Sequence, residues 1–196
     1  MMRISLFFLL FLVLASCGQR KKNSEPLDRP VPQEYFRNGG EIVAATQAEL
    51  LKNVTGAMQT GGPVHAIEFC NLQAMELKDS LSRLYDCEIR RIATKYRNSA
   101  DKPRTETEKE QLSRYGEEAD RGMSLEPVAY MFDDRVEYYY PIVINSGACL
   151  QCHGDPDTQI APETLAVIGE LYPGDLATGF SLHGFRGAWQ ITFSRE

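Results

Sequence analysis

The sequence has few of the features that mark nucleic-acid-binding or membrane-spanning proteins. It contains 21 lysines and arginines against 27 aspartates and glutamates, a formal net charge of −6, so it offers no concentrated basic face for phosphate contacts. Its one long apolar run, residues 4–14, is shorter than the roughly 20 residues that a membrane-spanning helix needs. With 196 residues, the chain has room for one domain of ordinary size, and we expect it not to bind nucleic acid.

The amino terminus has the composition of an export signal. Residues 1–16 contain thirteen apolar residues and a single charge, Arg3, which is typical of a secretory signal. The stretch Leu-Ala-Ser-Cys that ends at Cys17 resembles the bacterial lipobox, which implies cleavage before Cys17 and attachment of a diacylglycerol to its sulfur. An ordinary cleaved signal is the alternative. The lipid would anchor the chain in the bacterial cell envelope on the periplasmic side. Gly18, and not the aspartate that signals retention at the inner membrane, follows the cysteine, so we expect the outer membrane in preference to the inner one.

Residues 17–40 are predicted to form a flexible tether, because they are polar and contain Pro26, Pro30 and Pro32. Residues 41–196 are then the folded domain. Such a tether would hold a domain away from the membrane surface that carries the lipid.

Cysteine usage gives the most specific signal in the chain. Of five cysteines, Cys149 and Cys152 stand in the run Cys-Leu-Gln-Cys-His that ends at His153. This C-x-x-C-H pattern is the signature of covalent haem c attachment. Two thiols at this spacing add to the two vinyl groups of one haem, and the adjacent histidine is then placed on one face of the porphyrin, within reach of the iron. We therefore expect one covalent haem c per chain, with His153 as an iron ligand.

Three other interpretations of the Cys149/Cys152 pair remain open. A thioredoxin-like redox pair requires a βαβ context with a helix that begins at the first cysteine. Half of a zinc site requires a second Cys/His pair of suitable spacing, whereas His65 and His183 are isolated. A structural disulfide is the third alternative.

Hydrophobic periodicity and turn residues predict an α+β fold with an antiparallel sheet. Helices precede most of the strands, and the C-x-x-C-H run is expected in a loop or short turn beside the sheet. The predicted helices cover residues 41–59, 63–84, 106–118 and 162–171, and the predicted strands cover residues 87–96, 127–132, 136–144 and 187–193. The first two helices, joined by Gly61 and Gly62, should form an antiparallel hairpin.

Several side chains compete for the second axial position on a haem iron. Cys70 lies on an apolar stripe of the second predicted helix, together with Ile67, Ala74, Leu77, Leu81 and Leu84, so it should face the interior. The alternatives are a plain buried cysteine, a Cys70–Cys87 disulfide, one of the isolated histidines, a methionine such as Met58 or Met75, or an open position. Tyr138 and Tyr140 should lie on one face of their strand and Tyr139 on the other.

Six short segments, taken in their order along the chain, bear on the choice of the second axial ligand. They are Gly61–Val64, Ala66–Cys70, Lys95–Pro103, Cys149–Gly154, Tyr172–Phe180 and Phe185–Trp189. In this order they resemble a c-type haem family of unknown function, the Tll-like haem domains, over residues 41–196. The resemblance implies a PAS-like antiparallel sheet flanked by helices. It also implies His153 and Cys70 as the axial pair, with Arg97 and Arg186 as candidates for binding the haem propionates.

The chemistry of this ligand pair separates two classes of function. A thiolate favours ferric over ferrous iron, so a His/thiolate pair gives a low reduction potential, and loss of the thiolate on reduction would open a site for a small gaseous ligand. We therefore expect a haem protein for redox or gas sensing, or for one-electron transfer to a redox partner protein. A small peroxidase-like or nitrite-handling enzyme is the alternative, disfavoured because a strong sixth ligand would block substrate.

Overall fold

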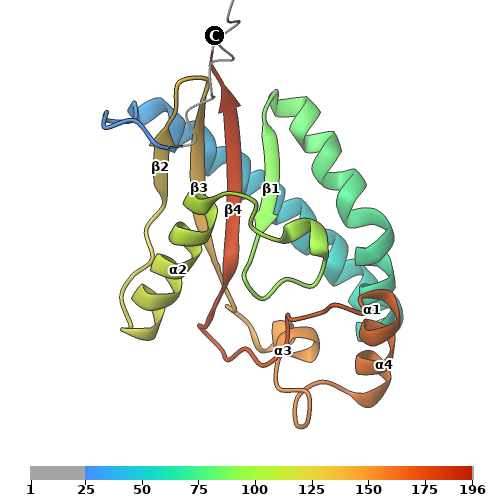
Figure 1. Ribbon diagram of the computed structural model, residues 1–196. Coiled ribbons are helices and arrows are strands. Elements are labelled where there is room, and N and C mark those ends of the chain that lie inside the picture. The colour runs from blue at the N-terminus through green and yellow to red at the C-terminus, as the bar shows by residue number, and fades with distance from the viewer. Residues whose placement is uncertain (1–24, 196) are drawn as a thin grey trace, which may run out of the picture.

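The structure is a computed structural model that describes residues 25–195, apart from the side chains of residues 73–75 (Figure 1). The predicted signal peptide, residues 1–16, and the lipidation site Cys17 lie outside the described residues, as does the side chain of Met75. In chain order the elements are α1 (Gln33–Tyr85), β1 (Glu88–Ile92), η1 (Ser99–Asp101), α2 (Glu106–Asp120), β2 (Val128–Met131), β3 (Arg135–Val143), α3 (Gly147–His153), α4 (Pro162–Leu171) and β4 (Phe185–Ser194). The predicted α+β class is confirmed.

Helix α1 is a hairpin of two antiparallel arms, as the Gly-Gly pair predicted (Figure 1). Gly61 and Gly62 leave the helical conformation, and Gly62 has a φ of 73°, a left-handed value that glycine adopts without steric cost. Pro63 begins the second arm, where its missing N–H does no harm. The hairpin brings the first arm, residues 33–60, alongside the second arm, residues 63–85.

The first arm begins at Gln33, eight residues before the predicted start at residue 41. Residues 33–40, which the sequence assigned to the tether, are therefore helical. The ring of Phe36 packs edge-on against Tyr138, with 6.0 Å between centroids. A Cβ on Gly39 would come within 2.5 Å of the same Tyr138 ring. Gly39 thus marks a close crossing of helix and sheet, within the stretch that the sequence assigned to the tether.

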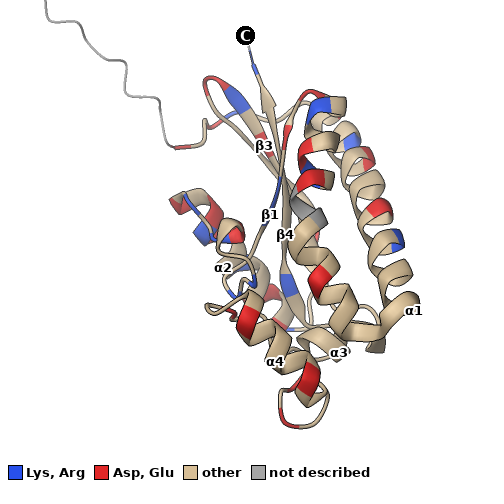
Figure 2. Cartoon of the chain, turned by 90° about the vertical axis from the view of Figure 1, so that its right-hand side faces the viewer, with Lys and Arg blue, Asp and Glu red and all other residues tan. Residues whose placement is uncertain are grey.

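The four strands form one antiparallel sheet in the order β1-β4-β3-β2. Figure 2 shows this sheet nearly edge-on, with the α1 hairpin on one face and α2 on the other. Tyr138 belongs to the core beneath α1 and Tyr139 to the core beneath α2, so their predicted opposite facing is confirmed. The α1 core also contains Ile42, Val43, Ile89, Trp189 and Ile191, and the α2 core contains Ile92, Leu112, Tyr115 and Ala188.

Helices α3 and α4 lie beyond one end of the sheet, near the turn of the α1 hairpin (Figure 1). A third, smaller core joins them to the second arm of α1 through Ile67, Ile160 and Ile168, and Cys152 packs against it. The C-x-x-C-H segment is therefore fixed to α1 by apolar contact. Among residues 25–195, no helix is both long and apolar enough to cross a membrane.

Candidate functional site

The C-x-x-C-H segment is a helix and not the loop or short turn that the sequence predicted. Helix α3 has seven residues and is capped by Ser146, whose side-chain oxygen accepts a hydrogen bond from the Ala148 N–H at 3.2 Å. Ser146, just before the C-x-x-C-H run, is the residue in the sequence that could have predicted the start of this helix. In a helix, Cys149, Cys152 and His153 follow i, i+3, i+4 spacing and share one face. The two thiols and the imidazole can therefore reach a single flat group.

His153 is held in a defined orientation. Its Nδ1 lies 2.7 Å from the carbonyl oxygen of Ala177 and donates a hydrogen bond to it. Burial, and next the charges of Arg186 and Arg97, hold the pKa of His153 well below its usual value, so the imidazole is neutral. With its proton on Nδ1, the ring presents the lone pair of Nε2 for coordination, the arrangement usual for metal-binding histidines.

Arg97 fixes the backbone around this histidine. Its side chain is only 7% exposed and is paired with Asp175, with Nε 3.1 Å from Oδ1. Its Nη2 donates to the carbonyl oxygens of Cys152, at 2.6 Å, and Ala177, at 3.3 Å. Arg97 therefore joins the end of α3 to the loop that accepts the His153 hydrogen bond.

The loop of residues 172–180 completes the attachment of α3. The Phe180 N–H donates to the carbonyl oxygen of His153 at 2.9 Å, and the two rings meet edge-on with 6.3 Å between centroids. The Gly179 N–H donates to the Gly154 carbonyl at 2.7 Å. Sequence reasoning did not identify Asp175, Ala177 or Phe180 as site residues; the only signal was that they lie in a segment shared with a known family.

The thiol environment does not match the alternative interpretations of the cysteine pair. Burial raises the pKa of Cys152, more than the charge of Arg97 lowers it, whereas redox-active thiols have a lowered pKa. All strand pairs are antiparallel, so the βαβ context of a thioredoxin-like pair is missing from residues 25–195. The same residues contain no group of three or more His, Cys, Asp or Glu side chains that could hold a metal ion. Cys149 and Cys152 are both free thiols.

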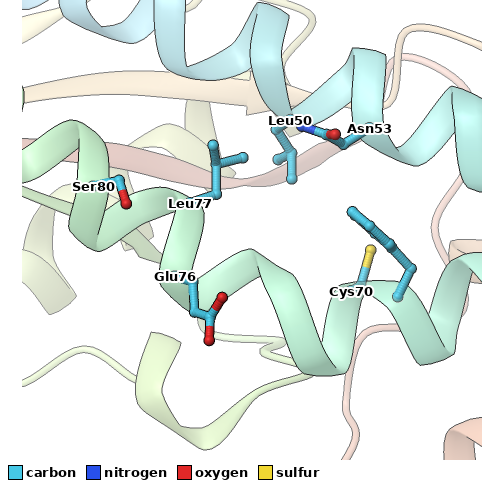
Figure 3. A pocket seen from close by; sticks show the side chains of 7 residues that line it. Leu50, Asn53, Cys70, Glu76, Leu77 and Ser80 are labelled. Carbon is cyan, nitrogen blue, oxygen red and sulfur yellow. The ribbon is translucent and has the colours of Figure 1, made fainter.

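Cys70 faces the interior of the molecule, as the apolar stripe predicted. Figure 3 shows its sulfur directed from the second arm of α1 toward Leu50 and Asn53 of the first arm, into a cavity of about 280 Å³. Burial raises the pKa of Cys70, and the nearby charges of Arg91 and Arg97 lower it by less. Cys70 also acts on the pKa of Cys152. The stripe does not extend to Leu84, which is exposed.

The alternative Cys70–Cys87 disulfide is wrong in this fold. The second arm of α1 is continuous from Cys70 to Tyr85, which at 1.5 Å per residue separates the two ends by about 22 Å. A disulfide requires Cα atoms within about 7 Å of each other. Both cysteines are free thiols.

The two other histidines lie on the surface. His65 has a side chain that is 44% exposed and lies 3.9 Å from the carboxylate of Glu68. His183 is exposed and has a left-handed φ of 67°.

Arg186 is the residue of the site whose bonding is incomplete. It is 6% exposed and donates from Nη1 to the carbonyl oxygen of Lys95 at 2.9 Å. Its Nε and Nη2 are buried without a hydrogen-bond partner among the described residues. The site thus combines two thiols, an oriented neutral imidazole, a third thiol on α1 and a buried cation with free donors. This set fits a haem, which offers vinyl groups, iron and carboxylates.

Comparisons with known proteins agree with this arrangement. A family model described as Tll0287-like matches residues 25–194. Among solved structures, one described as the crystal structure of the cyanobacterial heme-protein Tll0287 aligns with a TM-score of 0.61 and 24% sequence identity, and the alignment covers 85% of this chain and 98% of that chain. At this identity the structural match shows a shared fold. A search of curated proteins found no match.

Proposed function

The chain belongs to the Tll0287-like family, and we propose that it is a c-type haem protein, tethered to a membrane, that acts in redox or gas sensing or in one-electron transfer. The observation that carries the proposal is the face of α3, where Cys149, Cys152 and His153 lie together and the His153 ring is oriented by Ala177. A relative of the same fold is described as a heme-protein. This supports haem as the group that the face accepts.

In this proposal Cys149 and Cys152 hold the haem through thioether bonds, and His153 binds its iron through Nε2. Bound haem would supply an iron centre that exchanges one electron. The Nδ1–H of His153 stays on the Ala177 carbonyl, and Arg97 keeps that carbonyl in place through its second hydrogen bond. These contacts keep the imidazole ring from rotating.

We propose Cys70 as a second residue that would bind the iron of a haem held here. Because burial raises its pKa, Cys70 is a neutral thiol in the chain without haem, and a ferric iron beside it would favour the thiolate. The cavity between the two arms of α1 would accommodate the neutral thiol, which would leave a coordination position for a small gaseous ligand.

The proposal places the domain on the periplasmic side of a bacterial envelope. Residues 1–16 would direct export, and lipid on Cys17 would anchor the chain, by our expectation in the outer membrane. Covalent haem attachment takes place outside the cytoplasm, so the export signal and the C-x-x-C-H run support each other. A redox partner protein would meet the domain in that compartment.

Spectroscopy of the mature protein, expressed with the haem-attachment machinery, tests the proposal. We expect one covalent haem by mass, a low-spin thiolate-ligated ferric spectrum, and carbon monoxide binding only after reduction. Cys70→Ser should convert the ferric spectrum to one without thiolate ligation, whereas Cys87→Ser, on a cysteine away from the site, should leave it unchanged. An unchanged Cys70→Ser spectrum would exclude Cys70 as a ligand. A high-spin resting state with peroxide turnover would instead support a haem enzyme.

A further inference from the structure

Arg186 owes its position to an irregularity in the sheet. Along β3 and β4 the register is regular to the pair Ile142–Gly187, and the next pair is Val143–Phe185, so Arg186 is an additional residue in β4. Gly187 makes this bulge possible: its φ is 152°, and a Cβ there would lie 2.5 Å from the Ile92 carbonyl oxygen. A bulge turns a side chain away from the regular alternation. Here it directs a guanidinium into the site.

Among the described residues, the buried guanidinium has no carboxylate bonded to it. Its Nη1 is held by the Lys95 carbonyl, but Nε and Nη2, which form one edge of the planar group, are buried and unpaired. The nearby carboxylates are committed elsewhere, because Asp175 pairs with Arg97 at 3.1 Å and Asp101 with Arg91 at 2.9 Å. Burying an unpaired cation is costly, so such a group is normally matched by an anion.

The open edge of Arg186 lies next to the iron-binding face. The Phe180 ring lies 5.2 Å from the guanidinium carbon and meets the His153 ring edge-on at 6.3 Å. Arg186 is also the strongest charge acting on the pKa of His153. An anion bound at Nε and Nη2 would therefore sit at the margin of any group that His153 binds.

We infer that the Nε–Nη2 edge of Arg186 is a bidentate carboxylate site, and, resting on the proposed function, that it receives one haem propionate. Two parallel N–H groups match the two oxygens of a carboxylate. Arg97, the other arginine considered for this role, differs because its Nε and Nη2 are bonded to Asp175 and to two carbonyls. The geometry thus assigns propionate binding to Arg186 and a backbone-positioning role to Arg97.

A comparison of haem with haem dimethyl ester, in chains with and without Arg186, tests this assignment. In the mature chain carrying Cys149→Ala and Cys152→Ala, we expect haem to bind reversibly, so the affinities of haem and of haem dimethyl ester can be compared by absorbance titration. With Arg186 present, we expect the ester to bind at least about tenfold more weakly than haem, the scale of a charge-assisted pair. Arg186→Gln should weaken haem binding by a similar factor and leave ester binding unchanged. Arg186→Lys should retain part of the preference.

Other results of the titrations would lead to different conclusions about Arg186. Equal weakening of haem and ester by Arg186→Gln would overturn the inference and leave Arg186 a structural residue. Improved ester binding on addition of acetate would support the inference, because acetate would supply the carboxylate that the ester lacks. If neither haem nor ester binds, and the mature chain with both cysteines also carries no covalent haem by mass, the proposed function fails together with the inference. Arg195→Gln, just beyond the far end of β4, is the control and should leave both affinities unchanged.

Discussion

Two buried arginines on neighbouring strands of the sheet, Arg90 and Arg186, differ in their bonding partners. Arg90 of β1 lies beneath α2 and is paired with a carboxylate: Nη1 is 2.6 Å from Glu108 and 3.0 Å from Gln190 Oε1, and Nη2 donates to the Lys102 carbonyl at 3.3 Å, while Nε is buried without a partner. Arg186 of β4 is equally buried, but among the described residues its one hydrogen bond is to the Lys95 carbonyl. The sheet thus contains one buried arginine whose charge is matched by a carboxylate and one, beside His153, whose charge is not.

The difference marks the Arg186 region as the candidate site without reference to any relative. A buried cation paired with a carboxylate contributes to a particular packing arrangement, whereas an unmatched buried cation costs stability and persists for another reason. The Arg90 region holds no oriented imidazole or free thiol pair, and the Arg186 region holds both. Substitutions that remove the carboxylate partner of Arg90, or the unpaired charge of Arg186, therefore test this difference.

The largest effect on stability is expected where the buried Arg90–Glu108 ion pair is broken. Glu108→Gln leaves Arg90 buried without its anion, and the loss of unfolding free energy should be about 3 to 5 kcal/mol in chains with or without haem. Urea denaturation of both forms measures it. The exposed pair Lys109–Glu106 is the control, since Glu106→Gln should cost at most about 1 kcal/mol. A similar small loss for Glu108→Gln would mean that Arg90 is not held by its partner.

A smaller loss is expected at the third buried arginine. Asp175→Asn removes the charge opposite Arg97, but Arg97 keeps its two carbonyl acceptors, so the loss should be about 1.5 to 3 kcal/mol. Because Asp175 also accepts the Ala177 N–H at 3.0 Å, the loop that orients His153 should loosen. Weakened axial ligation in the haem spectrum would report this. An unaltered spectrum together with lost stability would limit Arg97 to a purely structural role.

Much of the fold follows from local signals in the sequence. The hairpin turn at Gly61 and Gly62, the opposite facing of Tyr138 and Tyr139, and helix α4 were all predicted because turn residues and periodicity act over a few residues. The start of α1 was predicted wrongly, because Gly39 serves a contact with Tyr138, which lies about one hundred residues away in the chain.

The sequence predicted the site residues that are adjacent in the chain. It did not predict the contacts between residues that only the fold brings together. Cys149, Cys152 and His153 form one short run, so the pattern identified them. Nothing local shows that Asp175 neutralises Arg97 and that Arg186 lacks an equivalent, because these pairings depend on the loop of residues 172–180 and on the bulge at Gly187. The sequence therefore proposed two equivalent arginines, which the structure distinguishes.

The smallest expected effect has the opposite sign and tests the contrast most directly. In the chain without haem, Arg186→Met removes an unpaired buried charge and should raise stability by on the order of 1 kcal/mol. It should also move the pKa of His153 upward, because Arg186 is the first charge among the causes that lower it. Nuclear magnetic resonance of the imidazole measures that change, with Arg195→Gln as the control.

The sign of the accompanying pH dependence is fixed by that pKa. The folded pKa of His153 is below the unfolded one, so below about pH 6.5 the unfolded chain binds the extra proton, and stability falls by at most about 1.4 kcal/mol per pH unit. Arg186→Met brings the two pKa values closer and should therefore reduce the total loss on acidification. If this variant is instead destabilised as strongly as Glu108→Gln, Arg186 has a structural partner after all, and the two arginines are alike.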